Sequence, residues 1–131
     1  MNRRLGLVTV VVRDYDEAIR FYTESLGFEL VEDTPLDQAG KRWVVVSPGR
    51  ASGAKVLIAR AANDDQAARV GDSTGGRVAF FLYTDDFRRD YRDYQQRGVA
   101  FVREPRTEPY GMVAVFRDLY GNLWDLIEPT K

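Results

Sequence analysis

The sequence repeats one pattern of strand and helix signals, and this duplication limits the folds open to the chain more than any other feature. The run Leu5 to Val12 is rich in β-branched residues, and Asp14 follows it as a candidate helix cap with Glu17 three residues on. Apolar residues then recur at helical spacing until Gly27, a residue type that commonly ends a helix. The pattern predicts a strand, a helix over 14–26 and a further strand over 28–32.

The second half of the chain repeats these signals. Arg77 to Tyr83 has the composition of a strand, either Asp85 or Asp86 caps a helix over 85–97, and Gly98 ends that helix before a strand over 99–103. Each half then contains two more predicted strands, at 42–47 and 55–60 in the first half and at 112–117 and 122–128 in the second. The sequence therefore predicts two tandem βαβββ modules.

These modules indicate the α+β fold class and a single domain over residues 1–131. Module one spans 5–60, module two spans 76–129, and the polar, alanine-rich residues 61–75 form the linker, with a short helix expected over 64–70. One module alone cannot cover both faces of its sheet. We therefore expect both modules in one open, curved mixed sheet, a barrel-like cup with the helices outside.

Composition excludes several classes of function. The 19 basic and 20 acidic residues give a net charge of -1, which provides no long-range attraction to nucleic acid or to an anionic membrane. There is no cysteine and no histidine, so disulfides, thiolate nucleophiles and histidine-dependent triads are ruled out. The apolar run near the N-terminus is too short for a membrane helix. We expect a cytoplasmic protein that binds neither nucleic acid nor membranes.

Strand alternation selects the residues expected to line the cup. Successive side chains of a strand point to opposite faces, which places Arg77, Ala79, Phe81 and Tyr83 on one face and Val78, Phe80 and Leu82 under a helix. By the same reasoning Asp125 faces the cup, whereas Trp124 belongs to the core. Arg77 is a plausible ion-pair partner for Asp125. Three roles stay open: the pair orients a ligand, Asp125 acts as a general base, or the carboxylate is only structural or in contact with water. The predicted ligand-binding residues are Arg77, Asp125, Phe81, Tyr83, Thr9, Leu7 and Trp43.

Two stretches resemble a known family. The run from Val10 through Asp14, Phe21-Tyr22 and Leu26-Gly27-Phe28, and the closing run Phe116 to Pro129, resemble the glyoxalase/bleomycin-resistance/dioxygenase proteins, also called the vicinal oxygen chelate superfamily. The resemblance spans nearly the whole chain. It implies two βαβββ modules that form an open cup, usually in a homodimer.

The same resemblance implies where a metal site would lie. Catalytic branches of the superfamily hold a divalent metal with histidines and glutamates, and these positions fall on Leu7, on Leu57 or Ile58, on Arg77 or Ala79, and on Asp125. One carboxylate is too few donors for a transition metal, and Arg77 would repel the ion. We expect no metal and no cofactor.

The leading functional hypothesis is metal-free binding of a small apolar or aromatic molecule, such as an antibiotic, in the cup. One alternative is an enzyme of the superfamily, a lyase, isomerase or dioxygenase, with a non-standard or metal-independent site. A second is an accessory domain whose cup is filled by its own side chains. Fold analogy does not choose the ligand.

Overall fold

The main helices begin at capping aspartates, as the sequence predicts. The computed structural model describes residues 1–50 and 53–131. The carboxylate of Asp14 accepts a hydrogen bond from the backbone N–H three residues on, at 2.9 Å, and begins helix α1 (Tyr15–Arg20). Asp86 accepts the equivalent bond at 3.1 Å and begins helix α3 (Phe87–Gln96). Of the two candidates in the second half, the cap is therefore Asp86 and not Asp85.

The two helices differ by one inserted residue. α1 continues into a single π-helical turn, η1 (Phe21–Ser25), whereas α3 has no such turn. Gly27 follows Asp14 by 13 residues, but Gly98 follows Asp86 by 12. A π-helical turn takes one more residue than an α-helical turn, which accounts for the difference. Both glycines have positive φ, 73° and 83°, which confirms them as the residues that end the helices.

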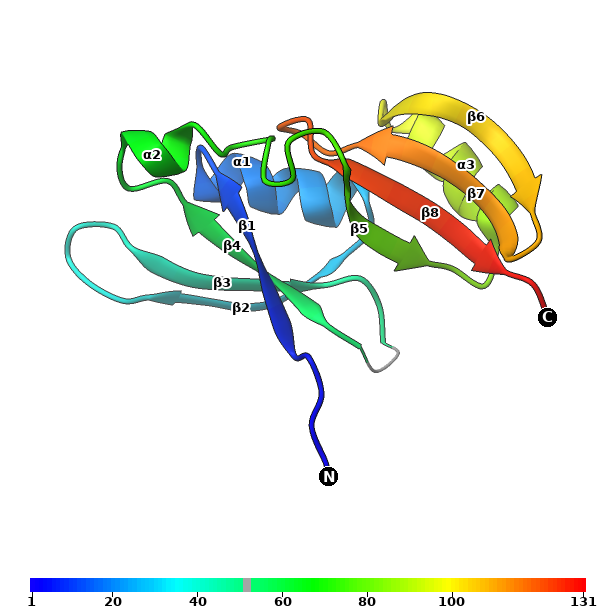
Figure 1. Ribbon diagram of the computed structural model, residues 1–131. Helices are drawn as coiled ribbons and strands as arrows, with labels where there is room; N and C mark the ends of the chain where they lie inside the picture. Colours follow the sequence, from blue (N-terminus) through cyan, green and yellow to red (C-terminus); the bar gives the residue numbers. More distant parts are fainter. Residues whose placement is uncertain (51–52) are drawn as a thin grey trace. The chain divides into compact units, whose positions relative to one another are not determined.

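The strands form two sheets with the same topology (Figure 1). The orders are β1-β4-β3-β2 and β5-β8-β7-β6, and in each sheet the first strand pairs in parallel with the last while the other pairs are antiparallel. This repetition confirms the two βαβββ modules. We expected one mixed sheet, but the hydrogen bonds form two mixed sheets of four strands, because each module completes its own ladder. The strands are β1 (Leu7–Val12), β2 (Glu29–Pro35), β3 (Arg42–Ser47), β4 (Lys55–Arg60), β5 (Val78–Tyr83), β6 (Ala100–Glu108), β7 (Gly111–Arg117) and β8 (Leu123–Pro129).

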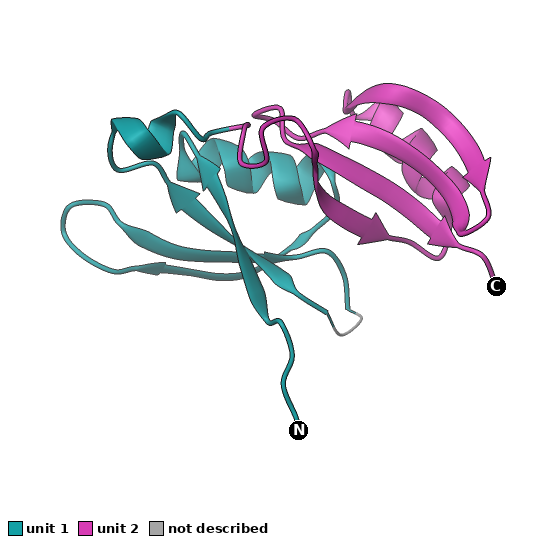
Figure 2. Ribbon diagram, viewed as in Figure 1, with its two compact units in different colours: residues 1–70 teal, residues 71–131 magenta. Residues whose placement is uncertain are grey.

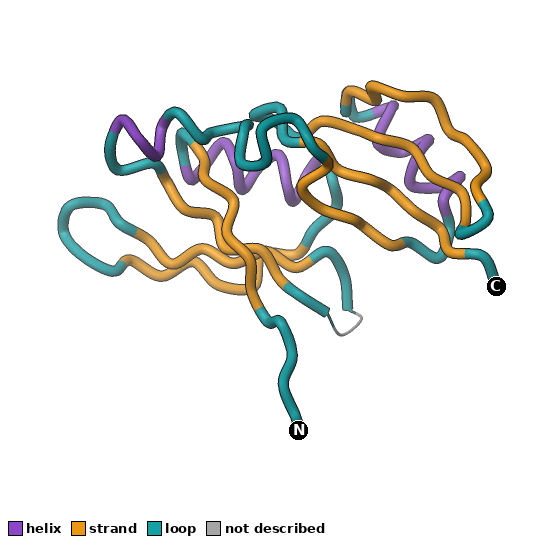
Figure 3. The backbone as a smooth tube through the Cα atoms, in the orientation of Figure 1, coloured by secondary structure: helices purple, strands orange, loops and turns teal. Residues whose placement is uncertain are grey.

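The chain divides into two compact units, Met1–Val70 and Gly71–Lys131, and each contains one module (Figure 2). The boundary falls inside the predicted linker. That linker also contains the short helix α2 (Asp64–Ala67) (Figure 3). Asn63 caps this helix by accepting a hydrogen bond from the backbone N–H of Gln66 at 2.9 Å. The helix is shorter than the predicted span of 64–70.

In each unit, one face of the sheet is covered by the unit's own helix. In the first unit the buried side chains of this face include Val10, Val12, Val44 and Ile58, together with Tyr22 of η1. In the second unit, Tyr94 of α3 packs edge-on against Phe116, with ring centroids 5.5 Å apart. Phe116 in turn stacks on Trp124, whose side chain is only 2% exposed. The prediction that Trp124 belongs to the core is confirmed.

Candidate functional site

The face of the second sheet opposite α3 brings together residues from all four strands. The register aligns Phe81 of β5, Asp125 of β8, Val115 of β7 and Arg103 of β6 in one row across the sheet. The next row contains Tyr83, Ile127, Val113 and Arg106. Two of the predicted site residues, Phe81 and Tyr83, therefore share a face with a third, Asp125.

Two aromatic rings of this face are open to solvent. Phe81 is 56% exposed and Tyr83 is 65% exposed. Exposed aromatic side chains beside a polar group are typical of surfaces that bind other molecules, because the ring provides apolar contact and the polar group fixes orientation. This face is therefore able to bind a flat apolar ligand.

Asp125 is half-buried, and its electrostatic environment differs from the one expected. Burial raises the pKa of the Asp125 carboxyl above its ordinary value, while the positive charges of Arg106 and Arg103 act in the opposite direction. The predicted partner was Arg77, but the charges that act on Asp125 are on β6. Arg106 itself is held by Glu108 at 2.6 Å. Sequence alternation misses both arginines because register shifts interrupt β6 between Phe101 and Arg103 and again between Arg103 and Arg106.

Arg77 lies outside β5, one residue before the strand begins, and is exposed. Between Val78 and Phe80, β5 advances by two residues while β8 advances by one, which makes Ala79 an extra residue in the strand. The rule that every second residue faces the same side of the sheet does not hold across Ala79. The prediction from this rule that Arg77 and Phe81 share one face is therefore wrong. Val78 is also wrongly placed, because it aligns with Leu123 on the face of Asp125. Arg77 stays a predicted ligand contact, but the alternation of side chains along β5 no longer supports that prediction.

The remaining predicted residues are on the first sheet. Thr9 of β1 aligns with Leu57 of β4, and Leu7 lies two residues before Thr9 on the same face. Thr9 and Trp43 line a cavity of about 730 Å³ in this unit, and the Trp43 side chain is 37% exposed. Leu7 is not among the residues that line this cavity.

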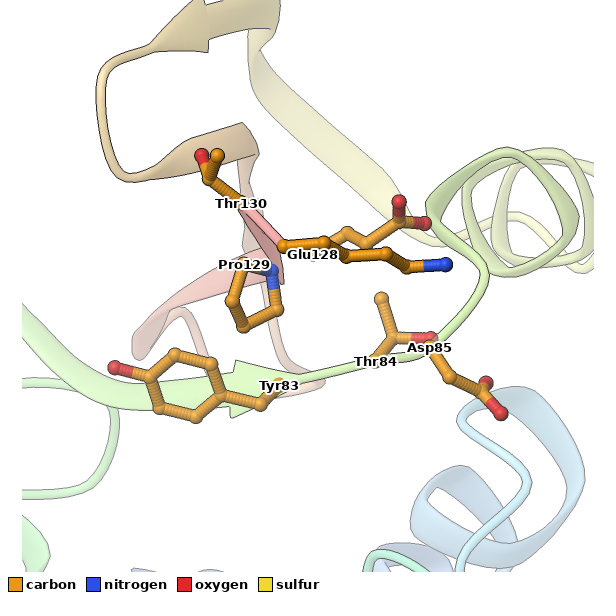
Figure 4. Close-up of a pocket in the computed structure, with 7 residues that line it drawn as sticks. Tyr83, Thr84, Asp85, Glu128, Pro129 and Thr130 are labelled. Carbon is orange, nitrogen blue, oxygen red and sulfur yellow. The ribbon is translucent and has the colours of Figure 1, made fainter.

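A smaller cavity of about 400 Å³ lies in the second unit, at the ends of β5 and β8 (Figure 4). Tyr83 is the only predicted site residue that lines it. Glu128 on its wall accepts a hydrogen bond from the backbone N–H of Phe87 at 2.8 Å, so this carboxylate already holds the start of α3.

Comparison with known proteins identifies the family. The model of the Glyoxalase/Bleomycin resistance protein/Dioxygenase superfamily matches residues 4–126. The chain belongs to this superfamily.

Proteins with similar sequences include an uncharacterized protein from Shewanella frigidimarina, 52% identical over 98% of this chain and 95% of that protein. Among solved structures, UcmS2 is 34% identical, covers 98% of this chain and 99% of its own, and has a TM-score of 0.84. TnmS3, an antibiotic binding protein from Streptomyces sp. CB03234, is 30% identical with 98% coverage of both chains and a TM-score of 0.77. These likenesses confirm the expected superfamily and fold.

The metal site of catalytic superfamily members does not fit the residues of this chain. Of the positions at which the resemblance places ligands, Leu7, Leu57 and Ala79 have no donor atom in their side chains and Arg77 is a cation, so Asp125 alone offers oxygen. Structural and catalytic sites use about three or four protein donors. Within residues 1–50 and 53–131, no group of three or more His, Cys, Asp or Glu side chains is arranged to hold a metal ion. No step of the function is therefore derived through a metal.

None of the helices in the described part of the chain combines the length and the apolar character that crossing a membrane requires.

We predict that Asp125→Asn raises thermal stability slightly at pH 7 but not at about pH 3. In the folded chain the raised pKa means that Asp125 holds its proton to higher pH than in the unfolded chain. Its ionisation therefore costs stability as the pH rises from the ordinary pKa of 3.8 through the raised value. Asparagine does not ionise and avoids this cost.

Scanning calorimetry at both pH values tests this prediction, with Asp72→Asn as a control that removes an exposed carboxylate. Equal pH dependence of the melting temperature in the parent and the Asp125→Asn variant would contradict it.

Proposed function

We propose that the protein binds a small apolar or aromatic molecule without a metal ion, on the face of the second sheet that carries Asp125. The observation that carries this proposal is the position of two exposed aromatic rings on the same sheet face as a half-buried carboxylate, Phe81 in the row of Asp125 and Tyr83 in the next row. The rings offer apolar contact area, and Asp125 accepts a hydrogen bond that orients the ligand. Arg77 is a further proposed contact in this unit, and Leu7, Thr9 and Trp43 are proposed contacts for a ligand on the first unit.

The comparisons support this proposal by analogy. TnmS3, which is similar over nearly the whole chain, is an antibiotic binding protein. The donor set argues in the same direction, because a single carboxylate cannot hold the metal that the catalytic branches use. Binding therefore accounts for the residues better than metal-assisted catalysis.

The test is a thermal-shift screen of the parent protein against antibiotics and aromatic metabolites, followed by affinity measurements on variants. We expect Phe81→Ala and Arg77→Ala each to weaken the binding of a screened ligand by about 1–3 kcal/mol. Asp125→Asn should weaken the binding of ligands that donate a hydrogen bond to this side chain by a similar amount. Leu119→Ala is the matched control, because it also removes an exposed apolar side chain, 44% exposed, from the second unit. Affinities unchanged in both Phe81→Ala and Asp125→Asn would refute the proposed surface.

We also propose a homodimer. Each sheet has two outer strands, each with a single hydrogen-bonded neighbour in its own sheet, and such edges are commonly protected by association. Sedimentation velocity at micromolar concentration is expected to show a dimer, and a monomer under these conditions would exclude it.

A further inference from the structure

The cavity of about 730 Å³ in the first unit combines an apolar wall with cationic side chains. Trp43, Leu57 and Leu36 form apolar parts of its lining, and Tyr15 adds an aromatic ring from α1. Lys41 and Arg60 lie on the same lining, one in the loop between β2 and β3 and the other at the end of β4. All of these residues belong to the unit Met1–Val70.

Two arginines flank the ring of Tyr15 in this cavity. The guanidinium carbons of Arg42 and Arg60 lie 5.0 and 5.1 Å from the ring centroid. Arg42 is already neutralised, because its guanidinium donates to both carboxylate oxygens of Asp33, at 3.0 and 2.7 Å, and also pairs with Asp16 at 3.0 Å. Arg42 therefore has a structural role and little capacity left for a ligand.

Arg60 differs from Arg42 in having no acid partner. In the described ranges 1–50 and 53–131, no carboxylate forms an ion pair with Arg60, and its side chain is exposed on the cavity wall. Its position is nevertheless defined, by Tyr15 on one side and by Gly40 on the other, where an added Cβ would lie 3.2 Å from a guanidinium nitrogen. A guanidinium held in place without an anion is prepared to donate two parallel hydrogen bonds to a carboxylate.

The one acidic side chain on this lining does not neutralise Arg60. Asp37 is turned to its own loop, where one carboxylate oxygen accepts hydrogen bonds from the backbone N–H groups of Ala39 and Lys41, both at 3.0 Å. Lys41 adds a second positive charge to the rim. With Arg42 paired to Asp33 and Asp16, the cations of the lining that remain to meet a ligand are Lys41 and Arg60, beside its apolar part.

We infer that this cavity binds a flat aromatic carboxylate, whose carboxylate is held by Arg60 and whose ring packs on the apolar part of the lining. This inference goes beyond the proposed function, because it assigns a second binding site, with its own class of ligand, to the first unit. Arg60 is thereby assigned as a specificity-determining residue.

The test compares 2-naphthoate with the uncharged 2-naphthamide, which has nearly the same shape. Both are titrated into ¹⁵N-labelled full-length protein, and the affinity is measured from the amide chemical shifts of residues 36–43 and 59–66. We expect naphthoate to bind about tenfold more tightly than naphthamide, as for a charge-assisted hydrogen-bonded pair that is partly exposed. In Arg60→Gln this preference should disappear, and in Arg60→Lys it should be reduced because the charge stays but the planar fork is lost.

Arg69→Gln is the matched control, because it removes an exposed arginine of the same unit that does not line the cavity. It should keep the full preference for naphthoate. If Arg60→Gln does not fold, the Arg60→Lys variant decides the comparison.

Three results would overturn the inference. These are equal affinities for acid and amide, a preference for the acid that survives in Arg60→Gln, and no binding of naphthoate at millimolar concentration. The proposed function fails separately, through the Phe81 and Asp125 variants in the ligand screen. Shifts confined to the amides around Phe81 and Asp125 would overturn the cavity inference while supporting the proposed function.

Discussion

Replacing Asp118 by alanine is expected to lower the free energy of unfolding by about 3 kcal/mol or more, because several hydrogen bonds to one buried carboxylate are lost and each contributes about 1.5–3 kcal/mol. The carboxylate is 5% exposed and accepts five hydrogen bonds. One oxygen accepts from the backbone of residues 120, 121 and 122 at 3.0–3.1 Å, and the other accepts from the side chains of Asn122 at 3.0 Å and Trp124 at 3.1 Å. Alanine removes the carboxylate that these donors share.

Urea denaturation of Asp118→Ala measures this loss, and Asp72→Ala is the control for removing an exposed carboxylate. Asp118→Asn is informative as well, because its amide keeps one acceptor oxygen but places an NH₂ group against the donors of Asn122 or Trp124. A loss below about 1 kcal/mol in Asp118→Ala would mean that the network contributes little.

Gly71→Ala is expected to destabilise the chain by more than about 2 kcal/mol, because two penalties act at the same position. Its φ of 77° is in the left-handed region that residues with a Cβ rarely adopt. In addition, a Cβ at Gly71 would overlap the backbone carbonyl oxygen of Tyr120, which lies in the turn held by Asp118. The backbone of one segment or the other must move to admit the methyl group.

A series of three glycine variants separates these penalties. At Gly49 an added Cβ would meet open space and the φ angle is not in the left-handed region, so Gly49→Ala should leave the free energy of unfolding nearly unchanged. Gly75→Ala has open space but a φ of 67°, and should cost about 1 kcal/mol from backbone conformation alone. Gly71→Ala should exceed Gly75→Ala by the cost of the overlap. Equal unfolding free energies for the Gly71 and Gly75 variants would show that the close approach to Tyr120 is easily relieved.

The fold was predictable because its signals are local. A capping aspartate, an apolar stripe and a terminal glycine recur in both halves, and the structure places Asp14 and Asp86 at equivalent helix starts. Strand order follows less directly, since hydrogen-bonded partners such as β1 and β4 are distant in sequence. The expectation of one sheet was wrong because the alternation of side chains within a strand does not reveal which strands are hydrogen-bonded to one another.

The candidate site was predictable only where strands are regular. Phe81, Tyr83 and Asp125 share a face as predicted, because β5 and β8 keep their register beyond Phe80. Arg77 was misplaced because the extra residue Ala79 precedes that regular stretch, and Arg103 and Arg106 were missed because β6 contains two register shifts. These bulges have no sequence signature, so a prediction that assigns every second residue to one face of the sheet cannot detect them.

The role of Asp118 was also underestimated from sequence. The residue types of the run Asp118 to Gly121 predict a turn in which the glycine is left-handed, and Gly121 has a positive φ of 104°. The turn is confirmed, but its aspartate is in addition the acceptor for Trp124. A tryptophan six residues after an aspartate is a weak signal, because the contact depends on how the turn returns into β8.

The two tryptophans differ in environment, and each unit contains one of them. Trp43 is 37% exposed on a cavity wall in the first unit, whereas Trp124 is 2% exposed in the core of the second. Indole emission shifts to the blue in an apolar environment, so the two side chains should emit at different wavelengths. A chain without Trp124 reports optically on occupancy of the cavity, and a chain without Trp43 reports on the packing of the second core. The protein thus contains an intrinsic fluorescent probe for each of its halves.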